Sequence, residues 1–208
     1  VMRAVYGVDR HDSGEVLIGN KKARIHHPKD SIRRGVSMVT EDRLMTGIIS
    51  ILSVRENMSL ANLPSYCNKL KFVQTAREER EVDKMVERMN VKLSTPAQPI
   101  GSLSGGNQQK AILGKWLLTK PNVLILDEPT RGIDVGAKYE IYSLIAKLAA
   151  EGMAVILISS ELPEIMGMAD RVITFCEGRI TAEFTSNEIE QERIVNAAFG
   201  FQNAEELS

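Results

Sequence analysis

A chain of 208 residues is long enough for one large domain and can bury roughly 70% of the surface that its unfolded form exposes. With 26 basic and 27 acidic residues the net charge is −1, so no basic excess indicates nucleic acid as a main partner. The longest apolar runs are too short to cross a bilayer and no charged-then-apolar leader opens the chain, so we expect a soluble, cytosolic protein that touches membranes only through a partner.

The cysteines and histidines give no sign of a metal site. Cys67 and Cys176 lack any CxxC or Cys/His spacing, which is typical of reduced thiols in a cytosolic protein. The histidines stand in loop or hairpin positions without ligand partners at helical spacing, and surface positions are expected for His11, His26 and His27.

The first forty residues predict a series of short elements. Val1 to Tyr6 has the composition of the end of a helix, which Gly7 would close. The other elements expected here are an antiparallel hairpin over 15–25, a short helix over 31–34 and a strand over 36–39.

A polar loop, Val-Thr-Glu-Asp-Arg over 39–43, follows this strand. By itself this stretch is consistent with an ordinary polar surface loop that carries Glu41. Ser53 and Glu56 then predict a capping box at a helix start. An apolar stripe at helical spacing follows, formed by Val82, Met85, Val86 and Met89, and it indicates packing rather than a cofactor site.

The most specific stretch of the chain runs from Leu103 to Lys138. Ser104, Gly105 and Gly106 open a helix, and its apolar face carries Ala111, Ile112, Leu113, Trp116 and Leu117. A serine before two glycines leaves the N–H groups of the first turn uncovered by side chains, which suits an anion docking there. For these three residues alone, an ordinary helix cap is the alternative.

A strand with two acids at its end follows the helix. Val123 to Leu126 is a continuous apolar run, typical of a parallel strand buried on both faces, and it leads into Asp127 and Glu128. Acids at a buried strand end are costly unless a positive or hydrogen-bonding group meets them. Mg²⁺ on a nucleotide is the natural counterpart, with Asp127 facing the metal and Glu128 orienting or polarising a water. A solvated strand-to-turn junction is the alternative.

The remainder of the chain predicts four further elements. They are a helix over 135–150, a second buried strand over 154–158, a hairpin over 170–176 and 179–184, and a closing helix over 187–199. Ser160, just after the second strand, would cap a helix that starts at Glu161.

Three motifs stand in an order that resembles one family. LSGGNQQK, VLILDEP and Gly132-Ile133-Asp134 are similar to the signature, the Walker B strand and the D-loop of the ATP-binding domain of ABC transporters. The longer forms LSGGNQQKAILGKWL and DEPTRGIDVGAK more closely resemble the second ATPase half of bacterial importers for simple sugars such as ribose, galactose, arabinose or xylose. The match covers nearly the whole chain.

The resemblance implies a P-loop NTPase-like α/β fold, in which helices flank a parallel sheet and an antiparallel β subdomain and a helical signature subdomain are attached. We expect one domain over 1–208, with a core over 1–42 and 120–208 and a helical subdomain over about 43–119. No GxxxxGK[ST] occurs in the sequence, so the strand and loop of Walker A are missing from it, as in a domain truncated after that loop.

The resemblance also divides the site residues between two nucleotides. Residues that would cover ATP held by a second ATPase half are Leu103, Ser104, Gly105, Gly106, Asn107, Gln108 and Asp134. Residues of the chain's own site would be Asp127 and Glu41 toward the metal, with Glu128, Ser160 and Glu41 in catalysis.

Two of these positions depart from the family. Glu41 replaces the usual Q-loop glutamine and cannot donate an amide hydrogen bond. Ser160 replaces the histidine that contacts the γ-phosphate; its hydroxyl can still bond a phosphate oxygen, without the reach or the ionisable ring of histidine. We therefore expect the main catalytic contribution to be made in trans, through the signature.

The activity implied is that of an ABC importer ATPase, with ATP and Mg²⁺ as cofactors, while the fragment alone is expected to be inactive. Expected partners are membrane permease subunits near residues 41–65, a second ATPase half and, indirectly, a sugar-binding protein, all at the cytoplasmic face of a bacterial inner membrane. The alternatives are a non-hydrolytic regulatory nucleotide-binding module and a non-transport ABC protein acting on DNA or the ribosome, which the absence of coiled-coil heptads and of a basic arm disfavours.

Overall fold

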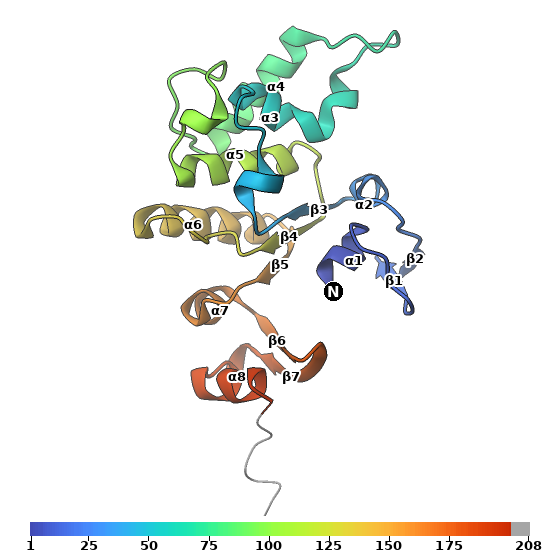
Figure 1. Cartoon of the computed structure of the whole chain (residues 1–208), viewed down its shortest axis with the longest axis vertical. Coiled ribbons are helices and arrows are strands. Elements are labelled where there is room, and N and C mark those ends of the chain that lie inside the picture. Colours follow the sequence, from blue (N-terminus) through green and yellow to red (C-terminus); the bar gives the residue numbers. More distant parts are fainter. Residues whose placement is uncertain (201–208) are drawn as a thin grey trace, which may run out of the picture. The chain divides into compact units, whose positions relative to one another are not determined.

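The computed structural model describes residues 1–200. They fall into two compact units, residues 1–158 and residues from 159 onward, and each unit is described by itself. The first unit is built on a parallel sheet, to which helices and a small antiparallel hairpin are attached (Figure 1). The predicted α/β class is confirmed.

The sheet has the order β3-β4-β5, with β3 over Val36–Val39, β4 over Val123–Asp127 and β5 over Ala154–Ile158. Both pairs are parallel, and the register sets Asp127 opposite Ile158. Leu124, Ile125 and Leu126 are fully buried, as a continuous apolar run in a central strand predicts. The sheet thereby brings Asp127 to the carboxyl edge.

Strand β5 corrects one prediction. It was expected to be buried, yet Ala154 and Ile156 are exposed and the other three residues are only half-buried. In the part of the chain that the structure describes, β5 pairs with β4 alone, so it is an edge strand. An apolar run does not distinguish a central strand from an edge strand, because pairing is decided by segments elsewhere in the chain.

Two N-terminal helices, α1 over Met2–Tyr6 and α2 over Pro28–Arg33, pack against β3. Between them in the chain lies the antiparallel pair of β1 over Val16–Ile18 and β2 over Lys21–Ala23. Gly7 ends α1 with φ 85°, and the predicted hairpin is confirmed. Helix α2 starts earlier than predicted because Pro28 occupies its first turn and Asp30 closes a capping box with His27.

A small core joins α1 to the sheet. Tyr6, Val36, Met38 and Ile125 form it, and the Tyr6 and Trp116 rings meet edge to face with centroids 6.2 Å apart. Trp116 belongs to α5, Gly105–Leu117, so this contact fixes the long central helix on the sheet.

The helices α3, α4 and α5 form a group beside the sheet (Figure 1). A π-helical turn over Arg43–Gly47 leads to α3 over Val54–Ser59, which the predicted capping box of Ser53 and Glu56 starts. A 3-10 stretch over Leu60–Tyr66, α4 over Thr75–Arg88 and a 3-10 turn over Ile100–Ser102 follow before α5.

The predicted apolar stripe of α4 packs onto α5. Val82, Met85 and Met89 are buried, and Gly114 of α5 makes room for them. A Cβ at Gly114 would lie 2.6 Å from Met58 Cε and 3.1 Å from Met85 Cγ, so glycine permits the close approach. The methionines therefore serve packing, as predicted.

Helix α6, Val135–Ala150, completes the first unit. The second unit holds α7 over Leu162–Met168, the antiparallel pair β6 over Arg171–Cys176 and β7 over Arg179–Thr185, a 3-10 turn over Ser186–Glu188 and α8 over Gln191–Ala198. Val172, Phe184 and Ile194 form its core. The closing helix begins at Gln191 rather than at 187, because Thr185 and Glu188 close a capping box around a separate short turn.

Candidate functional site

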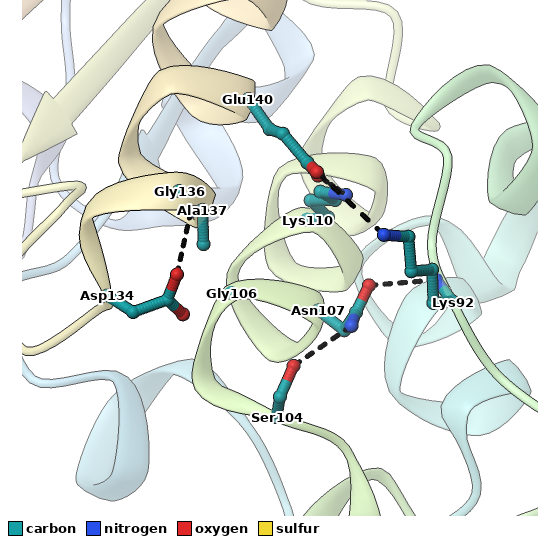
Figure 2. Close-up of a pocket in the computed structure, with 9 residues that line it drawn as sticks. All are labelled: Lys92, Ser104, Gly106, Asn107, Lys110, Asp134, Gly136, Ala137 and Glu140. Atoms are coloured by element: carbon teal, nitrogen blue, oxygen red, sulfur yellow. Dashed lines mark hydrogen bonds and ion pairs between the residues drawn. The ribbon is translucent and has the colours of Figure 1, made fainter.

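A pocket of about 320 Å³ lies where the N-terminal turns of α5 and α6 meet (Figure 2). Four of the predicted nucleotide-binding residues line it together, from two separate motifs. The complete lining is Lys92, Ser104, Gly106, Asn107, Lys110, Asp134, Gly136, Ala137 and Glu140.

The first turn of α5 has backbone N–H groups that no side chain caps. Ser104 is the N-cap residue, but its hydroxyl makes no capping hydrogen bond. It accepts instead a hydrogen bond of 2.9 Å from Asn107 Nδ2, while Asn107 Oδ1 accepts the N–H of Lys92 at 2.8 Å (Figure 2). No acidic residue stands in the first turn. The positive end of the helix dipole is therefore left for a ligand anion.

Gly106 sets how closely α5 approaches α6. A Cβ on this residue would lie 2.5 Å from the Cβ of Ala137, well inside van der Waals contact. Gly106 is buried although it lines the pocket. Only glycine therefore allows the two helix starts to meet at their observed spacing.

The first turn of α6 is capped by a carboxylate. Asp134 is its N-cap, and Asp134 Oδ1 accepts the N–H of Ala137 at 2.9 Å (Figure 2). The two helix starts at the pocket therefore differ. The N–H groups of α5 remain available to a ligand, whereas the dipole of α6 is already stabilised by the Asp134 carboxylate.

An ion pair closes the far side of the pocket. Lys110 of α5 is buried; its Nζ donates to the carbonyl of Asn90 at 2.9 Å and forms an ion pair with Glu140 of α6. Lys92 Nζ lies 4.0 Å from the second oxygen of Glu140 (Figure 2). The hydrogen bond and charge of Lys110 hold the pKa of Glu140 below its usual value. Together these contacts tie α5 to α6 at a second point.

The pKa of Glu140 predicts how stability depends on pH. Because the folded-state pKa is depressed, the stabilisation is present above about pH 4.5 and is lost as pH falls through the folded value. We expect Glu140→Gln to lower the free energy of unfolding by about 1 kcal/mol at pH 7, a small value because the carboxylate is partly solvated.

Urea unfolding between pH 3 and 8 measures this difference, which should shrink toward zero at the acid end. The exposed Glu87→Gln is a matched control, with no effect expected. A difference between Glu140→Gln and the parent chain that does not change with pH would contradict the assignment.

The acids at the end of β4 form a second group. Burial and the neighbouring Glu128 raise the pKa of Asp127. Glu128 has φ 48°, a left-handed conformation that is uncommon for glutamate, and its N–H donates to the carbonyl of Ile158 at 2.9 Å. Burial and repulsion between the two negative charges disfavour the ionised carboxylates, and a divalent cation beside Asp127 would relieve that repulsion.

Glu41 and three residues around the start of α5 are also predicted site residues, and their side chains or backbone have defined contacts. Glu41 is exposed and forms an ion pair with Arg131, so as a metal ligand it would have to exchange that partner. Leu103 and Gln108 are buried, and Gln108 Nε2 donates to the carbonyls of Leu103, at 3.1 Å, and Ile100, at 3.4 Å. Gly105 is half-buried and lies against the guanidinium of Arg43.

Ser160 is exposed and lies in the second unit. The alternative role of Ser160 as the cap of the next helix is wrong, because α7 begins at Leu162 and its N-cap is Glu161. The N–H of Glu161 is instead accepted by Ser159 Oγ at 3.0 Å.

Five lining residues were missed by the sequence analysis: Lys92, Lys110, Gly136, Ala137 and Glu140. Lys110 could have been predicted, because it lies one helical turn beyond Asn107 on the same face of α5. Lys92 and Glu140 carried no signal, because a hydrogen bond from the Lys92 N–H to Asn107 and the packing of α6 on α5 bring them to the pocket.

A family model for the ABC transporter matches residues 1–131, and the chain belongs to this family. Among curated proteins it is 46% identical over 200 residues to the ribose import ATP-binding protein RbsA of Oceanobacillus iheyensis, which covers 96% of this chain and 40% of the relative. It is 48% identical over 200 residues to a putative ribose/galactose/methyl galactoside import ATP-binding protein of Pseudomonas fluorescens, covering 96% of this chain and 39% of the relative. The chain therefore spans about two fifths of the length of these relatives.

Solved structures agree on the fold. An ATP-binding cassette of an ABC transporter in its ADP conformation superposes with a TM-score of 0.79 at 21% identity, covering 96% of this chain and 82% of that one. A dimeric cassette in a post-hydrolysis state, bound to ADP and Pi, gives 0.75 at 20% identity, covering 89% and 78%. Among residues 1–200 there is no helix with the length and apolar character to cross a membrane, and no group of three or more His, Cys, Asp or Glu residues arranged to hold a metal.

Proposed function

We propose that the chain is the second ATPase half of an ABC importer that couples ATP binding and hydrolysis to the uptake of a simple sugar. The observation that carries the proposal is the pocket in which Ser104, Gly106 and Asn107 meet Asp134. The uncapped N–H groups of α5 are the donors that γ-phosphate charge requires, and they act most strongly where an interface excludes water. ATP held by a second ATPase half would supply that phosphate.

The chain's own nucleotide site has the weaker chemistry. Asp127 would hold Mg²⁺ and Glu128 would orient the attacking water, with Glu41 and Ser160 in place of an amide and an imidazole. The metal supplies charge neutralisation on the phosphates, while the protein fixes the positions of the oxygens around them. The signature's contribution in trans is therefore the larger one. The division into a core over 1–42 and 120–208 and a helical subdomain over about 43–119 belongs to the same proposal.

The docking site for the membrane permease would be the stretch from Leu44 to Ile51, here called the 44–51 segment. Four of its large apolar side chains, Leu44, Met45, Ile49 and Ile51, are exposed. Exposed apolar side chains this close together are typical of a partner interface. Their contact with a permease would hold the protein at the cytoplasmic face of a bacterial inner membrane, where a sugar-binding protein acts on the opposite side.

Transport by the full-length protein, reconstituted with its permease and binding protein, tests the function. We expect ATP-dependent uptake of ribose, galactose or methyl galactoside, and failure to move any simple sugar would contradict the proposal. Calorimetry of the 208-residue chain with Mg-ATP tests the trans contribution, because these residues lack GxxxxGK[ST]. No tight binding and no turnover are expected, whereas micromolar affinity would mean a more complete phosphate site.

A further inference from the structure

A buried lysine stands on α5 outside the pocket. Lys115 is 8% exposed, and its Nζ donates to the carbonyl of Gly47 at 2.5 Å and lies 5.3 Å from the centroid of the Trp116 ring. Burial lowers the pKa of Lys115 to about 8. Its hydrogen-bond partner is a backbone carbonyl rather than a carboxylate, so the cost of burying the ammonium is only partly offset.

Gly47 and Ile48 are the buried residues of an otherwise exposed stretch. Gly47 lies inside the 44–51 segment, with Met45 and Ile51 exposed on either side. A Cβ at Gly47 would lie 2.9 Å from Ile112 Cδ1, so the backbone of the segment rests directly on α5. Lys115 and Ile112 are one turn apart on that helix. The segment is therefore seated on α5 at its centre.

Two further contacts hold the ends of this stretch. The guanidinium of Arg43 lies against Gly105, at the first turn of α5, where a Cβ would be 3.2 Å from it. On the other side, Asn57 exchanges hydrogen bonds with Ile49, accepting its N–H at 2.7 Å and donating to its carbonyl at 3.0 Å. Among the described residues, the hydrogen bond from Lys115 is the one that joins α5 to the middle of the segment.

Stability alone does not account for a lysine here. An apolar side chain of similar length could pack on Trp116 without losing hydration, and replacing a buried charge in this way is often neutral or stabilising. What an apolar residue cannot do is donate to the carbonyl of Gly47. The lysine thus provides a directional link between the signature helix and the segment.

We propose that Lys115 is a positioning residue that couples movement of the signature helix to the 44–51 segment, and through it to the permease. This inference rests on the proposed function, in which α5 binds ATP in trans and the segment docks on the membrane partner. The link joins both sites through one rigid helix. Its loss leaves nucleotide contacts intact while the segment no longer follows the helix.

The test compares uptake with ATP hydrolysis in the full-length protein reconstituted with its permease and binding protein. With Lys115→Met we expect the sugar transported per ATP hydrolysed to fall about tenfold, while the KM for ATP stays unchanged. Lys115→Arg keeps a donor and should restore at least half of the ratio. Ile112 is buried, so its Cδ1 has little room to turn away from a methyl group at residue 47. Gly47→Ala should therefore displace the segment without touching the lysine, and cause the same loss if Lys115→Met fails to fold.

The matched control is Asn62→Ala. Asn62 Nδ2 donates to the carbonyl of Leu118 at 2.9 Å, so this variant also removes a hydrogen bond to the end of α5, from a part of the chain outside the segment. It should leave the transport ratio unchanged. If the parent protein moves no sugar, the proposed function is wrong; if it does, an unchanged ratio in Lys115→Met and Gly47→Ala, or an equal loss in Asn62→Ala, overturns the inference.

Discussion

Adding one methyl group at Gly106 is expected to abolish ATP-driven uptake by the assembled importer. In Gly106→Ala the new Cβ would lie 2.5 Å from Ala137 Cβ, so the starts of α5 and α6 must separate. Overpacking of this kind costs about 1–3 kcal/mol of stability, and a displacement near 1 Å at a phosphate site costs about a hundredfold in rate. Uptake and ATP hydrolysis by the full-length protein measure the loss.

A compensating change identifies the cause of this effect. Ala137→Gly removes the atom that the new methyl group meets, so the double variant Gly106→Ala, Ala137→Gly should recover most of the activity. Ser160→Ala should have a much milder effect than Gly106→Ala, because in the proposed function the chain's main contribution is made in trans. Equal, mild effects of Gly106→Ala and Ser160→Ala would contradict that view, and a double variant as inactive as the single one would contradict the steric explanation.

Two charges in the 44–51 segment are expected to release the protein from its membrane partner. Met45 is 81% exposed and Ile51 is 85% exposed, so Met45→Glu with Ile51→Glu should leave the fold unchanged. At an interface, each change would bury a carboxylate in an apolar contact and weaken binding by about 2 kcal/mol. The two changes together would lower the affinity roughly a thousandfold. Co-purification with the permease and flotation with proteoliposomes report the loss.

The chain offers a control of the same chemistry elsewhere. Leu70 and Phe72 are 76% and 69% exposed, and they lie between Cys67 and Val73 in a loop apart from the segment. Leu70→Glu with Phe72→Glu introduces the same charge and should leave the permease bound. Release by this control pair, or retention of the permease by the Met45→Glu, Ile51→Glu protein, would remove the basis for docking at the segment.

Most of the fold followed from local patterns. The apolar run at 123–126, the capping box at Ser53 and the spacing of Val82, Met85 and Met89 each carry enough information to define an element and its buried face. Gly7 at the end of α1 is equally local, since its φ of 85° is one that glycine adopts readily. These signals depend only on neighbours in sequence.

The features that were not predicted depend on contacts between residues far apart in sequence. Strand β5 has the composition of a buried strand. In the described part of the chain it pairs with β4 alone, so its side chains stay partly exposed. Lys110 and Glu140 are thirty residues apart, and only the close contact of Gly106 with Ala137 brings their helices together. The uncapped start of α5 could be recognised from sequence because Ser104, Gly105 and Gly106 are adjacent in the chain. Lys92 and Glu140 could not, because they reach the pocket only through contacts between distant segments.

The charges around the pocket have a kinetic consequence. Its lining carries two ammonium groups, on Lys92 and Lys110, and two carboxylates, on Asp134 and Glu140, so its formal charge at neutral pH is zero. A nucleotide anion is then neither drawn in from a distance nor repelled by this lining, and attraction begins only at contact with the N–H groups of α5. In the proposed two-half ATP site, ionic strength should therefore alter the rate of closure over ATP far less than it would for a lysine-lined phosphate site.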